Sequence, residues 1–70
     1  MNQIQTGKMI KQLRQEKGYT QKQLAEYIHV SDKAVSKWER ELCYPDIFLL
    51  TDLSEILGVS IDEMLGKGQY

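Results

Sequence analysis

The segment from Thr20 to Arg40 constrains the fold more than any other, because two helix-start signals lie close together in it. Thr20 and Gln23 have the spacing of a capping box, in which each side chain accepts a hydrogen bond from the other residue's backbone N–H. Ser31 offers a second N-cap. This pattern predicts two short helices joined by a tight turn, the second covering about residues 32–39.

The helix over residues 32–39 is expected to bury one face and expose the other. Val35 and Trp38 are three residues apart and share the buried face. Leu24, Ala25 and Ile28 form the inner face of the preceding helix in the same way. The opposite side of the 32–39 helix carries the polar residues Asp32, Lys33, Ser36 and Lys37.

Three further helices are predicted from apolar periodicity and capping residues. The first runs from about residue 5 to 17 and ends before Gly18. Asp46 caps a fourth helix over residues 47–57, and Ser60 with Glu63 forms a capping box for a fifth over 61–65. The fourth helix is expected to bury Ile47, Leu50, Leu53, Ile56 and Leu57. The prediction is an all-α fold, a compact bundle of five short helices in one domain over residues 1–66, with 67–70 as a flexible tail or the start of a linker.

The charges are divided unevenly along the chain. Residues 1–40 carry a net charge of +4 and residues 41–70 a net charge of −5, within a total of −1. Such a division would attract a polyanion to one side of the molecule. The alternative is that the two halves have solvated faces that happen to differ in charge, with no ligand involved. No apolar run is long enough for a membrane span, and no signal peptide opens the sequence. A cytoplasmic protein is therefore predicted.

A metal site and an active site are not expected. Cys43 is the only cysteine and His29 the only histidine, so an intrachain disulfide is impossible and the usual set of zinc ligands is missing. The carboxylates fall on exposed helical faces, and no Gly-rich phosphate loop is present. The sequence predicts neither an enzyme nor a bound cofactor.

The residues MIKQLRQEKGYTQKQLAEYIHVSDKAVSKWERELCYPD and LSEILGVSIDEML resemble the helix-turn-helix domain of lambdoid phage repressors, Cro proteins and bacterial xenobiotic-response-element (XRE) regulators. The likeness covers about residues 5–65. It implies a DNA-binding transcriptional regulator, encoded by a bacterium or a phage and associated with the nucleoid. The helix over about 32–39 would enter the major groove.

The resemblance also assigns roles to individual residues. It places Ser31, Asp32, Lys33, Ser36 and Lys37 at the exposed positions of the recognition helix, and Gln21 and Arg40 at phosphate-contacting positions. Lys22 is assigned to phosphates as well. Arg14 and Glu39 match positions that form a mostly buried structural ion pair. Asp32 has two interpretations: it accepts a hydrogen bond from cytosine, or it only stabilises the first helical turn.

Two positions depart from the family pattern. His29 stands in the turn where glycine is frequent, which requires a left-handed backbone that histidine tolerates. Glu41 stands where glycine or asparagine is usual, which puts the backbone-to-phosphate contact of that loop in doubt.

Phe48 and Leu49 lie beside the apolar stripe of the fourth helix. They are interpreted as a dimer or partner surface, or as side chains packed under the preceding connection or the N-terminus. The sequence thus predicts a repressor that binds a palindromic double-stranded DNA operator as a homodimer. Two alternatives are an antitoxin or phage-switch protein that chiefly serves a protein partner, and a protein-interaction module without DNA binding.

Overall fold

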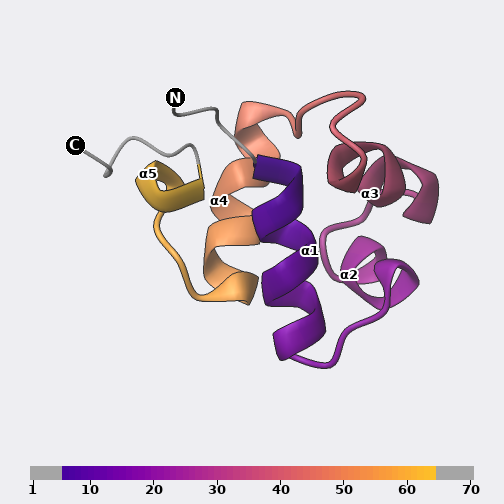
Figure 1. The fold of residues 1–70 in the computed structure, drawn as a ribbon, viewed down its shortest axis with the longest axis horizontal. Helices are drawn as coiled ribbons and strands as arrows, with labels where there is room; N and C mark the ends of the chain where they lie inside the picture. Colours follow the sequence, from indigo (N-terminus) through magenta and orange to yellow (C-terminus); the bar gives the residue numbers. More distant parts are fainter. Residues whose placement is uncertain (1–5, 65–70) are drawn as a thin grey trace.

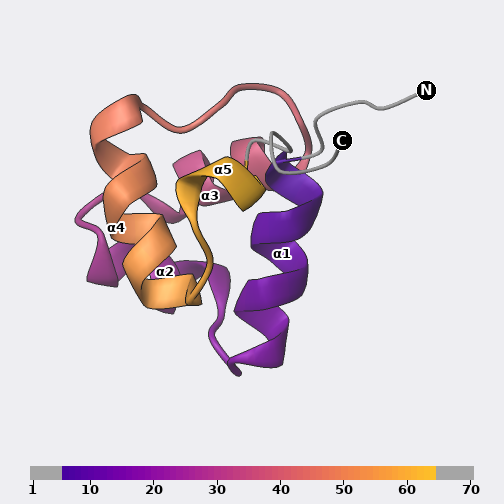
Figure 2. The same ribbon diagram turned by 90° about the vertical axis from the view of Figure 1, so that its left-hand side faces the viewer.

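The computed structural model describes residues 6–64, and within that range it contains five helices and no strand. Figure 1 shows α1 between α4 and α5 on one side and α2 and α3 on the other. Contacts of α1 with α3, α4 and α5 make it the central element, and the view in Figure 2 agrees. The helices are α1 (Thr6–Glu16), α2 (Gln21–Tyr27), α3 (Asp32–Glu39), α4 (Ile47–Leu57) and α5 (Ile61–Met64).

This arrangement confirms the predicted all-α bundle with a helix-turn-helix formed by α2 and α3. The predicted domain boundary at residue 66, the tail over 67–70 and the last residue of the fifth helix, Leu65, lie outside the described residues. No helix within residues 6–64 has the length and apolar character that a membrane span requires.

The predicted helix starts are formed by the expected side chains. The Thr20 hydroxyl accepts a hydrogen bond from the Gln23 N–H at 3.0 Å, and the Gln23 side chain accepts one from the Thr20 N–H at 2.9 Å. The Ser31 hydroxyl accepts from the Ala34 N–H at 3.1 Å. At the start of α5, the capping box of Ser60 and Glu63 is formed by two hydrogen bonds of 3.0 Å, each from the backbone N–H of one residue to the side chain of the other.

A glycine ends α1 as predicted. Gly18 has a φ of 80°, and its N–H donates to the carbonyl of Gln15. The N–H of Tyr19 donates to the carbonyl of Arg14, so the two bonds complete a Schellman motif. The left-handed residue reverses the chain and directs it toward α2.

The core contains most of the side chains that were predicted to be interior. Val35, Trp38, Leu24 and Ala25 are buried, and Ile56 is half-buried. The complete set of buried apolar residues comprises Ile10, Leu24, Ala25, Ile28, Val35, Trp38, Leu50, Leu53, Leu57 and Met64.

The prediction that Ile47 is buried is wrong, because this side chain is 71% exposed. Its spacing from Leu50 places it on the correct side of α4. However, Ile47 is the first residue of the helix, where the chain arrives from the connection, and the buried stripe begins only at Leu50. The Ile47 side chain therefore stays outside the core.

Gly7 allows the first turn of α1 to lie against the end of α3. A Cβ atom at this position would lie 1.8 Å from the carbonyl oxygen of Trp38, a distance that no side chain can tolerate. The Thr6 hydroxyl is buried and donates to the carbonyl of Met64 at 2.9 Å. These contacts join the start of α1 to both α3 and α5.

Candidate nucleic-acid interface

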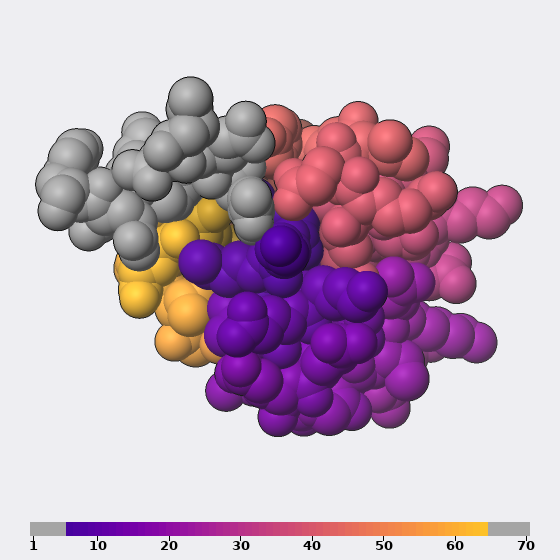
Figure 3. All heavy atoms as spheres, viewed as in Figure 1, coloured from indigo at the N-terminus to yellow at the C-terminus, as the bar shows by residue number. Residues whose placement is uncertain are grey.

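One face of α3 is free for a ligand. Asp32, Lys33 and Lys37 are exposed and Ser36 is half-buried, while Val35 and Trp38 are buried on the opposite face. Lys33 and Lys37 are four residues apart and therefore project from the same side of the helix. In the space-filling view, long side chains of the α2–α3 region project outward along the right-hand margin (Figure 3).

Ser31, the remaining residue of the predicted base-contacting set, is exposed and serves as the N-cap of α3. Its hydroxyl oxygen is used in the cap, but the hydroxyl hydrogen stays available to an external acceptor. All five predicted residues therefore occur at the start or along one side of the same helix.

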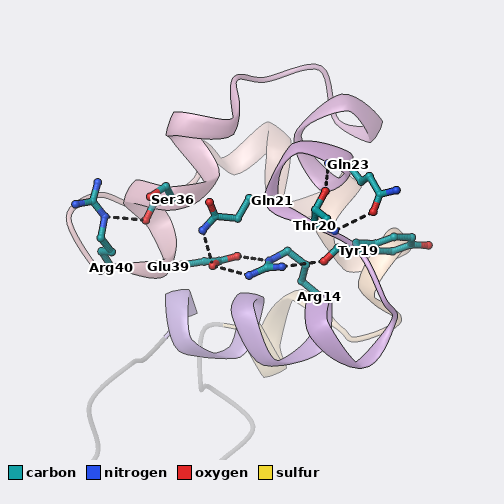
Figure 4. Close-up of polar contacts among 8 residues, drawn as sticks. All are labelled: Arg14, Tyr19, Thr20, Gln21, Gln23, Ser36, Glu39 and Arg40. Carbon is teal, nitrogen blue, oxygen red and sulfur yellow. Dashed lines mark hydrogen bonds and ion pairs between the residues drawn. The ribbon is translucent and has the colours of Figure 1, made fainter.

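An ion pair fixes the C-terminal end of α3 to α1. Arg14 Nε donates to Glu39 Oε2 at 2.6 Å, and an Nη2 hydrogen donates to Glu39 Oε1 at 3.1 Å. The two side chains are only 9% and 3% exposed, respectively. Arg14 also donates to the carbonyl of Tyr19 at 2.8 Å (Figure 4). The ion pair predicted from the family resemblance is thus present. Through Arg14 it joins α1 to the end of α3 and to the connection before α2.

The structure adds a contact that the sequence did not indicate. The side-chain amide of Gln21, at the start of α2, donates to Glu39 Oε1 at 3.0 Å (Figure 4). Glu39 therefore connects α3 both to α1 and to α2. Because Gln21 and Glu39 lie on different helices, no local spacing rule could have identified this pair.

The other two residues assigned to phosphates, Lys22 and Arg40, are exposed. Arg40 is the C-cap of α3, and its Nε donates to the carbonyl of Ser36 at 3.4 Å. With Gln21, these residues lie at the start of α2 and at the end of α3.

Both departures from the family pattern adopt a left-handed backbone. His29 has a φ of 62° and Glu41 a φ of 61°. The Glu41 carboxylate accepts a hydrogen bond from the backbone N–H of Lys8 at 3.1 Å. The Glu41 side chain is therefore hydrogen-bonded to the first turn of α1.

The two residues proposed as a partner surface differ in environment. Phe48 is 81% exposed, whereas Leu49 is half-buried and packs against the core. Three more large apolar side chains in the adjoining segment are exposed, namely Leu42, Tyr44 and Ile47.

The histidine and the cysteine, His29 and Cys43, are both exposed. Among residues 6–64, no group of three or more His, Cys, Asp or Glu side chains is placed so that it could hold a metal ion.

The sequence profile of the helix-turn-helix family matches residues 10–64 of this chain. The HTH-type transcriptional regulator ImmR of Bacillus subtilis is 41% identical over 63 residues, which cover 90% of this chain and 50% of ImmR. The HTH-type transcriptional regulator SinR of Bacillus licheniformis is 40% identical over 62 residues, covering 87% of this chain and 56% of SinR. The chain spans about half the length of these curated relatives.

Solved structures of related proteins have the same fold. The P22 c2 repressor bound to a synthetic operator superposes with a TM-score of 0.86 at 32% identity, covering 94% of this chain and 98% of the repressor chain. SinR, the master regulator for biofilm formation, in complex with DNA gives a TM-score of 0.78 at 41% identity, covering 86% of this chain and 97% of the SinR chain. A complex of SinR with the SinI protein gives a TM-score of 0.81 at 38% identity, covering 91% of this chain and 63% of that chain.

The relatives are named as regulators of transcription and none as an enzyme, which agrees with the prediction for this chain. The family profile covers most of the sequence, and the fold matches that of repressor domains crystallised with DNA. The chain therefore belongs to the helix-turn-helix family, in the branch of the phage Cro/C1 repressors and the XRE-type regulators.

Proposed function

We propose that this chain is the DNA-binding domain of a transcriptional repressor that inserts α3 into the major groove of double-stranded DNA. The observation that carries the proposal is the division of α3 into a buried face and an exposed face with two lysines, on a helix whose end is fixed by the Arg14–Glu39 pair. The solved complexes of the P22 c2 repressor and of SinR with DNA support it.

Sequence would be read by the exposed residues of α3 and its N-cap. Lys33 and Lys37 are suited to donate to guanine O6 or N7, and a good contact of this kind contributes about 1–3 kcal/mol of discrimination. Ser31 and Ser36 carry hydroxyls that suit several bases. Asp32 either accepts from a cytosine amino group or only stabilises the start of α3.

Position on the duplex would be set by Gln21, Lys22 and Arg40 through the phosphates. Such contacts fix the register of the recognition helix without reading sequence. The hydrogen bond from Gln21 to Glu39 restricts the Gln21 amide before DNA arrives. Glu39 is thus a positioning residue for a phosphate contact, besides being the partner of Arg14.

A homodimer on a palindromic operator would complete the site, because one α3 helix reads only a few base pairs. Dimers of this class contact half-sites about 34 Å apart, one turn of B-DNA. Such a protein would work at the bacterial nucleoid or on a phage genome.

Selection from a library of random duplexes at moderate salt tests this function. A palindromic consensus is expected, and a lack of enrichment even at low salt would contradict DNA recognition. In the selected duplex, Lys37→Ala should relax the preference at one position of each half-site. Gln21→Ala should weaken binding to all sequences equally, and the opposite pattern would reverse the two assignments.

A second candidate function is a phage-switch or antitoxin-type protein, whose main task is to hold a protein partner. The complex of SinR with SinI and the exposed Phe48 favour it. In that case, a substitution at Phe48 would abolish partner binding while leaving DNA affinity intact. A module without any DNA binding would give no enriched duplex at all.

A further inference from the structure

An acidic residue stands directly beside the proposed DNA surface. Glu41 follows Arg40, the residue assigned to a phosphate at the end of α3. A carboxylate next to a phosphate contact would repel the duplex and weaken its binding. The direction of the Glu41 side chain therefore decides whether this residue opposes DNA binding or supports it.

The backbone around Glu41 ends α3 in a defined conformation. Glu41 has a φ of 61°, and its N–H donates to the carbonyl of Trp38 at 3.0 Å. The N–H of Leu42 donates to the carbonyl of Lys37 at 2.9 Å. The two bonds form a Schellman motif whose left-handed residue is Glu41. Glycine is usual at this position because it has no Cβ atom, so a glutamate here is strained and needs a contact that compensates.

The start of α1 supplies this contact. The Glu41 carboxylate accepts a hydrogen bond from the backbone N–H of Lys8 at 3.1 Å, from a residue 33 positions away. Lys8 is the third residue of α1, and the N–H groups of a first turn have no acceptor within their own helix. A carboxylate is also favoured at this positive end of the helix dipole. Glu41 thus caps α1 from the connection that follows α3.

Gly7 makes room for the capping carboxylate. A Cβ atom on Gly7 would lie 3.0 Å from Glu41 Oε2, in addition to its clash with the end of α3. The first turn of α1 therefore lies against the last turn of α3 and against the Glu41 side chain. The end of α3 is held at two points, by the Arg14–Glu39 pair and by the bond between Glu41 and Lys8.

The side chain of Arg40 takes the other direction. Its Nε donates to the carbonyl of Ser36 at 3.4 Å, so the side chain runs back along α3 and away from α1 (Figure 4). Two adjacent residues of opposite charge are thus separated. The Glu41 carboxylate lies on α1, and the Arg40 guanidinium lies along α3, where a phosphate can reach it without meeting the acid.

We propose that Glu41 is a positioning residue for DNA binding, whose bond to the first turn of α1 holds the connection after α3 so that Arg40 faces a phosphate. This role rests on the proposed function. It reverses the sign that charge alone predicts, because the loss of an acid beside the DNA surface should weaken binding.

Hydrogen exchange of the Lys8 amide tests the contact itself without DNA. Glu41→Ala removes the acceptor, so the Lys8 N–H should exchange about tenfold faster. Glu41→Gln keeps an oxygen acceptor at the same reach and should retain most of the protection. The matched control is Glu55→Ala, which removes another exposed acid, from α4, and should leave the exchange of Lys8 unchanged. Equal exchange in the wild type and Glu41→Ala would overturn the contact.

Affinity for the selected duplex tests the consequence. Glu41→Ala should bind about tenfold more weakly, and its slope of log K against log salt concentration should fall by about 1 per bound copy, because the phosphate contact of Arg40 is lost. Glu41→Gln should restore wild-type affinity or exceed it. Glu55→Ala changes the net charge by the same amount and should bind like the wild type. Far-UV circular dichroism verifies that each variant is folded.

A double-mutant cycle assigns the effect to Arg40. In an Arg40→Gln background, Glu41→Ala should have no further effect on affinity, since the contact that Glu41 positions is already missing. Two losses that simply add would contradict the positioning of Arg40. Tighter binding of Glu41→Ala than of the wild type would show that the acid only repels the phosphates. Binding of Glu41→Gln as weak as that of Glu41→Ala would exclude the hydrogen bond as the cause.

Failure of the positioning role differs from failure of the proposed function. Wild type that binds no duplex, although its Lys8 amide is protected, contradicts the DNA-binding function and with it the positioning role. Wild type that binds its consensus duplex while Glu41→Ala keeps the same affinity and salt slope overturns the positioning role alone.

Discussion

Two residues adopt a left-handed backbone although neither is glycine. His29 has a φ of 62° in the turn between α2 and α3, and Glu41 has a φ of 61° after α3. For an L-residue this region costs about 1–2 kcal/mol, because Cβ approaches the following carbonyl oxygen. Both residues lie in the connections that lead into and out of the recognition helix, so the strain is located next to α3.

We expect His29→Gly to raise the free energy of unfolding by up to about 1 kcal/mol. Glycine adopts a positive φ without the Cβ penalty, and part of this gain is offset by the larger entropy of its unfolded chain. His29 is exposed, so little packing is lost. Urea unfolding measures the change, with His29→Ala as the control that keeps the strain. A gain in the alanine variant equal to that of glycine would show that the backbone angle is not the cause.

The left-handed backbone at His29 was expected from the family resemblance, because glycine is frequent at that position of the turn. The sequence did not predict the role of Glu41. The carboxylate of Glu41 accepts the Lys8 N–H from the start of α1, a residue 33 positions away. That contact depends on the packing of α1 against α3, which also requires Gly7. A local pattern contains no information about such a partner.

At the scale of elements, the orientation of α3 depends on buried polar contacts as well as on the apolar core. Glu39 accepts hydrogen bonds from Arg14 of α1 and from Gln21 of α2. Since these contacts are made at the last residue of α3, they fix the angle at which its exposed face is presented. The apolar face alone, Val35 and Trp38, would permit more rotation about the helix axis.

Glu39→Leu should lower the free energy of unfolding by about 3–5 kcal/mol, because it leaves the buried Arg14 guanidinium without its partner. A domain of this size has about that much stability in total, so the variant should be largely unfolded. The double variant Arg14→Met/Glu39→Leu should refold, since apolar replacements remove the unpaired charge. Urea unfolding with far-UV circular dichroism measures both.

DNA affinity separates the structural role of Glu39 from its positioning role. The folded double variant lacks the acceptor for Gln21, so we expect weaker binding to all duplexes alike. Wild-type affinity in the double variant would mean that the Gln21–Glu39 bond contributes nothing to DNA binding. A double variant no more stable than Glu39→Leu alone would contradict the cost assigned to the unpaired arginine.

Helix boundaries were predictable where a capping residue and its partner are close in sequence. The capping box of Thr20 and Gln23 is such a case, and the structure contains both of its bonds. Ile47 shows the limit of the same reasoning. Periodicity assigned it to the buried face of α4, but burial also requires a neighbouring element, and among residues 6–64 none covers the Ile47 side chain. Ile47 and Phe48, the first two residues of the helix, are therefore exposed.

At the scale of the whole molecule, the net charge conceals a division between two halves. The residues through Arg40 carry the positive excess and the rest of the chain the negative excess. Not every lysine of the positive half faces the proposed DNA surface. Lys17 follows α1, and its ammonium group lies near Gly58 at the end of α4. A Cβ atom added to Gly58 would be 3.6 Å from Lys17 Nζ. This lysine lies on the α4 side of the molecule, away from α3.

The salt dependence of DNA binding should therefore distinguish two cations of the same half. Each phosphate contact contributes about 0.9 to the slope of log K against log salt concentration, because a condensed counterion is released. Arg40→Gln should lower the magnitude of the slope by about 1 per bound copy, or about 2 for a dimer. Lys17→Gln changes the net charge equally but should leave the slope as it is. Titrations between 50 and 200 mM salt, a range over which such contacts lose much of their affinity, measure both variants. Equal slopes for the two would mean that the molecule's overall charge, not a phosphate contact by Arg40, attracts the DNA.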